Sequence, residues 1–324
     1  MLRSATSSAL ALAALATSAL LGGAPAGAVS RVWVSHLGSD GNPCTAASPC
    51  ATFQHAHNVV AAAGEISVLD PGDYGLVTIT KAVSITNDGA GEAGILNTGS
   101  LAAAVTVNAA GGDVVSLRGL VLEGAGTGGF GIVANSVGGL HVQNCVVRNF
   151  EGPLSIGIVM IANTGASKLF VSDSLVYNNG SAPNTGGIFV QAQGGSINAL
   201  LNRVQMEDNV LGLKVSSTSA GSNVHLTLRD STLVGNAGDG VLAAVSGGSG
   251  AFVFVERTTA VNNAGSGLHA DGAHAVILLS DSSVTNNGSG VSTTNGGQLI
   301  SYVNNGNNNN VGPEGTATGT NPLF

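Results

Sequence analysis

The chain has 324 residues, of which only 9% are charged, and its formal net charge is −8. Its ten basic residues are scattered, whereas a nucleic-acid-binding protein needs basic clusters that neutralise phosphates, so we expect no nucleic-acid partner. The 49 glycines are also common in disordered chains, but a hydrophobic fraction of 44% at regular spacings indicates a packed core.

The first 28 residues have the three parts of a secretory signal peptide. Arg3 supplies the basic region, residues 9–21 form the apolar region, and Ala26-Gly27-Ala28 is a small-residue cleavage site. A membrane anchor is the alternative, but the apolar run is short and Ser18 interrupts it. We therefore expect cleavage after Ala28, no membrane span, and secretion to the extracellular space or the periplasm.

The next segment, residues 29–64, has features of a cap. Cys44 and Cys50 enclose a short proline-containing loop, and in an oxidising compartment a disulfide between them is expected. Zinc is the alternative, but only these two thiols lie close in sequence, so we expect no metal site.

A short helix is predicted after this loop. Ser48 suits its N-cap, Pro49 its first turn and Gly64 its end. Its apolar residues fall on one face: Phe53, Ala56, Val60 and Ala63. An amphipathic helix here would cover the open end of a stacked-repeat fold, which otherwise exposes core residues and unpaired strand edges.

From about residue 115 the chain repeats one eleven-residue block. The blocks end at residues 150, 179, 209, 236, 263 and 287, in steps of 24 to 30 residues. Periods of about 20–50 residues are typical of stacked repeats. Within each block apolar and polar residues alternate with the period of two of a β-strand, and no repeat contains a helical pattern.

Each repeat contains three strand-like stretches, which predicts three parallel sheets with neighbouring turns about 4.8 Å apart. Two stretches lie within the block, and the third follows a glycine, as in Gly187-Ile188 and Gly240-Val241. The block ends on asparagine in every case except Phe150, giving a predicted structural ladder: Asn179, Asn209, Asn236, Asn263 and Asn287. Stacked asparagines can hydrogen-bond to one another and to the turn backbone, and we expect them to accept the left-handed backbone of a tight turn.

The repeat pattern resembles the right-handed parallel β-helix of the pectate-lyase-like superfamily. The stretch from GSDGNPC to ITKAVSI (residues 38–85) resembles the cap and first rungs of secreted bacterial members. The resemblance covers about residues 30–303 and implies an all-β solenoid of three parallel sheets with a short N-terminal capping helix. We expect one domain over 29–303, with its cap at 29–64 and rungs at 65–303, an irregular tail at 304–324, and a monomer.

The fifth block position alternates acid and base along the stack. Its members form a predicted charge ladder: Asp173, Arg203, Asp230, Arg257 and Asp281. A strip that grips a sugar chain is one interpretation. We favour a surface ion-pair ladder that fixes the register of the rungs, since charges at turns usually face water.

A second polar set lies on the strand after each glycine, where residues two and four positions later should point outward. Early rungs are apolar there, whereas later rungs carry Gln191, Lys214, His269 and Asp271, with Asp239 just before Gly240. In related pectinolytic enzymes the corresponding sheet holds the cleft, and acids beside such strands carry catalysis. The resemblance therefore implies Asp239, His269 and Asp271 as catalytic candidates, with Gln191 and Lys214 as substrate contacts; scattered solvent-facing polar residues are the alternative.

Two reactions would suit this set. A carboxylate pair can hydrolyse a glycosidic bond, or a base can remove the proton beside a uronate while Ca²⁺ neutralises its carboxylate. The chain lacks the Asp-Asp, Gly-His-Gly and Arg-x-Lys motifs of polygalacturonases and the Trp-Ile-Asp-His segment of pectate lyases. Its aromatic content is only 4%, which disfavours stacking platforms for sugars.

The superfamily also includes adhesins and phage tailspikes, so the fold does not decide the activity. We expect a secreted protein that binds a polysaccharide or cell-surface glycan, and cleavage by a lyase or hydrolase mechanism stays open. A non-catalytic surface or matrix protein with a structural or adhesive role is the alternative. We expect no cofactor, with Ca²⁺ as the one candidate ion.

Overall fold

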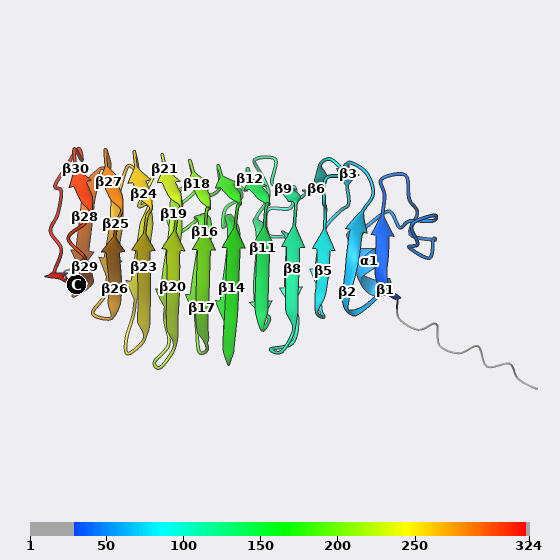
Figure 1. Cartoon of the computed structure of the whole chain (residues 1–324), viewed down its shortest axis with the longest axis horizontal. Helices are drawn as coiled ribbons and strands as arrows, with labels where there is room; N and C mark the ends of the chain where they lie inside the picture. The colour runs from blue at the N-terminus through cyan, green and yellow to red at the C-terminus, as the bar shows by residue number, and fades with distance from the viewer. Residues whose placement is uncertain (1–28, 322–324) are drawn as a thin grey trace, which may run out of the picture.

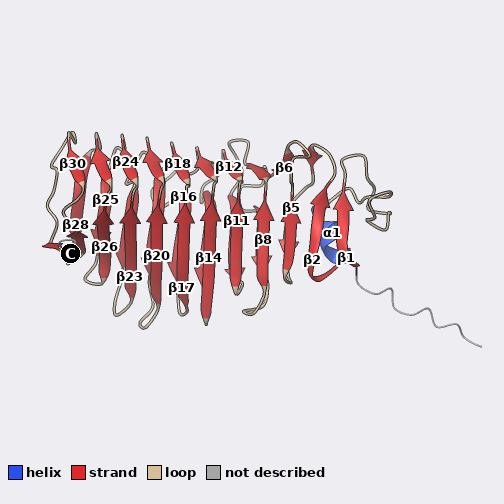
Figure 2. Cartoon of the chain, in the orientation of Figure 1, coloured by secondary structure: helices blue, strands red, loops and turns tan. Residues whose placement is uncertain are grey.

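The computed structural model describes residues 29–321, so the predicted signal peptide lies outside the described residues. Its strands stack side by side into one elongated solenoid, with the cap at the N-terminal end (Figure 1). The fold is the predicted right-handed parallel β-helix with three parallel sheets. The described residues contain one helix, of seven residues, and it is too short to span a membrane (Figure 2).

Each sheet contributes one strand to a turn, and every neighbouring pair within a sheet is parallel. The twelve-stranded sheet has the order β1 (Val29–Val34), β2 (Val60–Val68), β5 (Val83–Thr86), β8 (Val114–Arg118), β11 (Gly139–Gln143), β14 (Ala166–Ser172), β17 (Ser196–Asn202), β20 (Asn223–Arg229), β23 (Gly250–Glu256), β26 (Ala275–Ser280), β29 (Gln298–Ser301) and β31 (Gly319–Thr320).

The other two sheets complete each turn. The ten-stranded sheet has the order β3 (Gly72–Asp73), β6 (Ala93–Leu96), β9 (Leu120–Glu123), β12 (Val146–Arg148), β15 (Leu175–Tyr177), β18 (Gln205–Glu207), β21 (Thr232–Val234), β24 (Thr259–Val261), β27 (Ser283–Thr285) and β30 (Gly306–Asn308). The nine-stranded sheet contains β4 (Val77–Ile79), β7 (Ala103–Asn108), β10 (Phe130–Ser136), β13 (Ile156–Ala162), β16 (Gly186–Ala192), β19 (Leu211–Ser217), β22 (Val241–Val245), β25 (Ser266–Asp271) and β28 (Ser289–Thr294).

The core is a set of apolar columns that run the length of the solenoid. Leu140, Leu169, Ala199, Leu226 and Val253 are register partners on successive turns, and all are buried. Alternation places each of these side chains inward and its chain neighbours outward. Burial of these apolar columns is the main favourable contribution to folding.

The Asn side chains at the block ends form a buried ladder between the ten- and nine-stranded sheets. The backbone N–H and the side-chain Nδ2 of each one donate to Oδ1 of the next, as Asn179 does to Asn209 at 3.1 and 2.9 Å. Nδ2 also donates to a backbone carbonyl of the turn before, as from Asn209 to Val176 at 2.9 Å. The polar groups of the ladder amides are thereby hydrogen-bonded although these side chains are buried.

A column of glycines lies against this ladder. An added Cβ on Gly240 would meet the Gly267 carbonyl oxygen at 2.6 Å and Asn263 Nδ2 at 3.0 Å. Gly187 and Gly212 are enclosed in the same way on earlier turns. At the start of these strands of the nine-stranded sheet only glycine fits, because the ladder amide and the backbone of the next turn fill the volume that a side chain would need.

The left-handed backbone lies elsewhere than predicted. The ladder asparagines have no positive φ; the residue before the last position of each block has, with φ between 52° and 68°: Asn149, Asn178, Asp208, Gly235, Asn262 and Asn286. A second left-handed set, with φ between 44° and 53°, occupies the fifth block position: Asn144, Asp173, Arg203, Asp230, Arg257 and Asp281. Both corners turn through one left-handed residue, which is mostly Asn or Asp, the side chains that tolerate this backbone best after glycine; Gly235, Arg203 and Arg257 are the exceptions.

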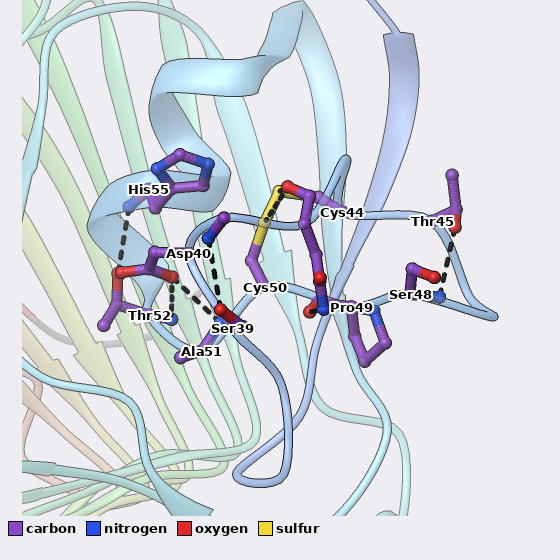
Figure 3. Close-up of a disulfide and its surroundings, with 12 residues drawn as sticks. Ser39, Asp40, Cys44, Thr45, Ser48, Pro49, Cys50, Ala51, Thr52 and His55 are labelled. Atoms are coloured by element: carbon purple, nitrogen blue, oxygen red, sulfur yellow. Dashed lines mark hydrogen bonds between the residues drawn. A yellow bond between two sulfur atoms is a disulfide. The ribbon is translucent and has the colours of Figure 1, made fainter.

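The cap confirms the disulfide and corrects the helix bounds. Cys44 and Cys50 are joined, beside the start of α1 (Phe53–Val59) (Figure 3). The predicted start at Ser48 and Pro49 is wrong, because the N-cap is Thr52, whose side chain accepts from His55 N–H.

Asp40 holds this helix start in place. Its carboxylate accepts from the N–H groups of Ala51 and Thr52 and from the Thr52 hydroxyl, at 2.8–3.0 Å. The predicted helix end at Gly64 is also wrong, since Val60–Val68 form strand β2 and Ala63 is exposed.

The predicted irregular tail at residues 304–324 is wrong in part. Strand β30 pairs with β27, and β31 pairs with β29. Asn310 Oδ1 accepts from Asn287 Nδ2 at 3.1 Å, so it extends the amide ladder by one turn. Asparagine side chains in this segment make the bonds that a further regular turn would make, and the solenoid continues through it.

Candidate functional site

The outer face of the nine-stranded sheet carries the predicted site residues. Strand register aligns one outward column along it: Thr106, Val133, Val159, Phe189, Lys214, Leu242, His269 and Ser292. A second column lies two residues further along each strand: Ile161, Gln191, Ser216, Ala244, Asp271 and Thr294. The face is therefore apolar on early turns and polar on late ones.

The structure brings Asp239, His269 and Asp271 into one hydrogen-bonded chain. Asp239 Oδ2 lies 2.9 Å from His269 Nδ1, and Oδ1 accepts from Ser266 N–H at 2.7 Å. His269 Nε2 lies 2.9 Å from Thr294 Oγ1. The Thr294 hydroxyl is in turn 2.7 Å from Asp271 Oδ1, so a threonine joins the histidine to the second carboxylate.

Lys214 and Gln191 lie apart from this series of hydrogen-bonded side chains. Lys214 lies two turns before His269 in its column, with Leu242 between them. Gln191 lies three turns before Asp271, with Ser216 and Ala244 between them. Lys214 Nζ instead donates to Asn184 Oδ1 at 2.8 Å, with the Phe189 ring centre 5.5 Å away. The predicted set is therefore two groups on one face.

Neighbouring charges tune the late-turn cluster. The hydrogen bond that His269 makes to the Asp239 carboxylate raises the pKa of His269, while desolvation opposes the rise and the charges of Asp239 and Asp271 add to it. Hydrogen bonds from Thr294 and Asn295 lower the pKa of Asp271. Burial lowers the pKa of Lys214. At neutral pH Asp271 is therefore ionised, and His269 holds its proton to a higher pH than free histidine.

An apolar groove of about 630 Å³ lies on the early turns of the same face. Its floor includes Phe130, Val133, Val159 and Ile161. Its polar lining residues are Gln54, Thr78, Thr106, Asn135 and Gln191. The predicted contact Gln191 thus lines the groove, which sequence reasoning did not identify although it noted apolar residues here.

The cluster's geometry limits its chemistry. Both oxygens of Asp239 are engaged by His269 and Ser266, and Asp271 Oδ1 accepts two hydrogen bonds, one from Thr294. His269 and Thr294 link the two carboxylates through hydrogen bonds, whereas the carboxyl pair of a glycosidase flanks the glycosidic bond itself. The arrangement is suited to moving a proton between a hydroxyl, an imidazole and a carboxylate.

Sequence reasoning missed Thr294, the hydroxyl at the centre of this chain. It lies four residues after Gly290, the same spacing that places Gln191 and Asp271 on the face. The signal was available, but a threonine among many polar residues did not stand out.

The predicted charge ladder lies on a different corner and is discontinuous. Arg203 binds Asp173 through two nitrogens at 2.6 and 3.0 Å, and Arg257 binds Asp230 at 2.8 and 3.1 Å. Within residues 29–321 no ion pair joins these two pairs or reaches Asp281. The ladder therefore consists of two exposed ion pairs between neighbouring turns.

A second groove, of about 540 Å³, lies on the outer face of the twelve-stranded sheet. Its rings stack on each other along the solenoid axis, as His225 does on Phe252 with centres 4.8 Å apart. The ring faces of this groove therefore contact neighbouring rings of the protein. The groove has no carboxylate among its lining residues, so the chemically equipped face is that of the nine-stranded sheet.

No protein-family model and no curated protein matches this sequence. Among solved structures, the crystal structure of pectate lyase Pel9A is similar, with a TM-score of 0.63, 14% identity, and coverage of 91% of this chain and 79% of that one. A rhamnogalacturonan lyase matches with a TM-score of 0.41 and 12% identity, over 81% of this chain and 82% of that one. The first similarity shows that this chain has a pectate-lyase-like β-helix fold.

Proposed function

We propose that this is an exported protein that binds a polysaccharide chain along the outer face of the nine-stranded sheet. The observation that carries the proposal is the continuity of that face. The apolar groove of the early turns leads through Phe189 and Lys214 to the Asp239–His269 cluster of the late turns. An elongated ligand that lies parallel to the solenoid axis would contact all three regions.

The groove lining suits sugar rings. Val133, Val159 and Ile161 supply an apolar floor for the C–H faces of a pyranose. Gln54 and Gln191 offer amide groups that can bond to hydroxyls. A few placed polar groups over an apolar floor are the usual make-up of a small-molecule site.

The charges of the face favour a neutral chain. Lys214 and His269 are the only basic residues within the nine strands, and Asp239 and Asp271 lie at the same face. A polyuronate would meet two carboxylates and a single lysine. We therefore propose a neutral or esterified glycan, bound without Ca²⁺.

Two further observations support the setting. The similar solved structure is, by its name, a pectate lyase, so one protein of this fold acts on a polysaccharide. The Cys44–Cys50 disulfide supports export, because disulfides persist mainly in oxidising compartments.

Binding of a glycan panel by isothermal titration calorimetry tests the proposal. The panel contains neutral xylan, galactan and glucan oligosaccharides and anionic polygalacturonate, each with Ca²⁺ and with a chelator. Val133→Arg would place a charge in the groove floor and should weaken binding by at least about tenfold, or 1.4 kcal/mol.

Val146→Arg is the matched control, since Val146 is a half-buried outward valine on the ten-stranded sheet. It should bind as the wild type does. Failure of the folded wild type to bind any neutral glycan, or equal effects of the two substitutions, would overturn the proposal.

A further inference from the structure

We propose that Thr294 is a nucleophile, activated by His269 and oriented through Asp239, and that it hydrolyses carboxylic esters. The ester-bearing substrate is an O-acylated sugar, and this part rests on the proposed glycan binding. The assignment of the nucleophile stands on the geometry of the late turns alone.

The three groups come from successive turns in the order that hydroxyl activation requires. Asp239 precedes β22, His269 lies on β25, and Thr294 ends β28. His269 Nδ1 is 2.9 Å from Asp239 Oδ2, and its Nε2 is 2.9 Å from Thr294 Oγ1. A hydroxyl, a base within hydrogen-bond reach, and a third group that orients the base are the signature of an activated nucleophile.

Exposure follows the same order. The side chains of Asp239 and His269 are 17% and 22% exposed, whereas Thr294 is exposed. The N–H of Ser266 donates to the other oxygen of Asp239 at 2.7 Å and so fixes the carboxylate. The carboxylate in turn orients the imidazole, whose Nε2 faces the threonine hydroxyl. A substrate can reach the hydroxyl while the acid and base lie behind it.

Asp271 gives the hydroxyl two proton arrangements. When His269 is protonated, Nε2–H donates to Thr294 Oγ1, and the hydroxyl donates to Asp271 Oδ1 at 2.7 Å. When His269 is neutral with its proton on Nδ1, Nε2 can accept the hydroxyl proton. The neutral form is therefore the reactive one, and the charged groups facing His269 are Asp239 and Asp271.

The turn after Thr294 offers donors for a developing oxyanion. Asn295 and Gly296 are both left-handed, with φ of 49° and 84°, and the turn closes with Gly297 N–H to Thr294 O at 2.9 Å. Within residues 29–321 the N–H groups of Asn295 and Gly296 have no backbone acceptor. Backbone N–H groups directly after a nucleophile can stabilise a tetrahedral oxyanion.

The reaction balances with water as the only co-substrate. Thr294 Oγ1 attacks the acyl carbon and gives its proton to His269 Nε2. The bond from the acyl carbon to the sugar oxygen breaks, and that oxygen takes the proton from His269. Water then attacks the acyl-threonine and gives a proton to His269, the acyl–Oγ1 bond breaks, Oγ1 regains the proton, and the carboxylic acid leaves.

The test compares Thr294→Val, which keeps the shape and removes the hydroxyl, with Thr294→Ser, which keeps the hydroxyl. The probes are p-nitrophenyl acetate and acetylated xylan, with release of nitrophenol or acetate as the readout. Thr294→Val should lose at least about 100-fold in rate, as expected for loss of an activated nucleophile, and Thr294→Ser should retain turnover. Thr285→Val, on the ten-stranded sheet, is the matched control and should hydrolyse both probes as the wild type does.

A fluorophosphonate probe adds a readout that a structural threonine would not give. Mass spectrometry should locate the adduct on Thr294 in the wild type, and not in Thr294→Val. Equal rates for wild type and Thr294→Val, no hydrolysis by a folded wild type, or an adduct at another residue would overturn the nucleophile.

The same proteins separate this inference from the proposed function. Binding of deacetylated xylan by the wild type is measured beside the hydrolysis rates of wild type and Thr294→Val. Ester hydrolysis without any glycan binding would sink the proposed function and leave the nucleophile standing. Glycan binding with equal hydrolysis rates would do the reverse.

Discussion

Replacing Asn236 by alanine tests whether the buried amide ladder holds the turns together. Asn236 Oδ1 accepts from the backbone N–H and Nδ2 of Asn209, at 3.0 and 3.3 Å. Its Nδ2 donates to Met206 O at 3.2 Å and to Asn263 Oδ1 at 2.7 Å. The substitution removes all four bonds from a residue with no exposed surface.

The partners set the magnitude. Asn209 Nδ2 and Asn263 Oδ1 keep other bonds, but the backbone N–H of Asn209 loses its acceptor in a buried site. The orphaned buried donor costs about 1–3 kcal/mol and each of the three other bonds about 1 kcal/mol, so we expect a loss of about 4–6 kcal/mol in the free energy of unfolding.

Urea denaturation followed by far-ultraviolet circular dichroism measures the effect. Asn198→Ala is the matched control, because Asn198 is exposed on β17; it should change the free energy by no more than about 0.5 kcal/mol. A loss below about 1 kcal/mol for Asn236→Ala, or one equal to that of the control, would refute the account of the ladder.

Gly240→Ala should lose about 2 kcal/mol of stability, because its Cβ would lie 3.0 Å from Asn263 Nδ2 and closer still to backbone; an unchanged urea midpoint would contradict this. Asp239 raises the pKa of His269 in the folded protein. The pair therefore stabilises the fold fully below the pKa that histidine has in the unfolded chain, and progressively less as the pH rises through the higher pKa of the folded state. The midpoint difference between wild type and Asp239→Asn should therefore shrink over that pH window, and a constant difference would count against the pair. Arg257→Ala should leave the midpoint near that of the wild type at physiological salt despite its close contacts, because the pair is exposed; a large shift would show that the corner ion pairs fix the rungs.

The regular turns were predictable because their signals are local. An inward residue, an Asn at the block end and a Gly at the next strand recur because each turn meets the same neighbours. The physical role of the glycine was not predictable, since it depends on the Asn263-type amide of a neighbouring corner, which only packing reveals. The helix start depends on Asp40, twelve residues before Thr52, and therefore on the path of the cap loop.

The candidate site shows the same division. Outward positions two and four residues after each glycine were correctly placed by the strand period, so Asp271 and Gln191 lie on the predicted face. The bonds between their side chains depend on rotamers and on which turns are adjacent. The sequence therefore predicted a face, and the structure divided it into a groove and a hydrogen-bonded cluster.

The position of that cluster follows from the parallel register. In a β-helix, residues distant in sequence by one period stack at about 4.8 Å, so side chains from three turns can form one linear chain of hydrogen bonds. His269 pairs in register with Leu242 and Ser292, so its side chain reaches diagonally to Asp239 on one neighbouring turn and to Thr294 on the other. Under the proposed mechanism, the solenoid assembles an acid, a base and a nucleophile from three neighbouring turns. The apolar groove of the early turns lies on the same face, so the proposed glycan binding and the proposed chemistry would share the solenoid axis.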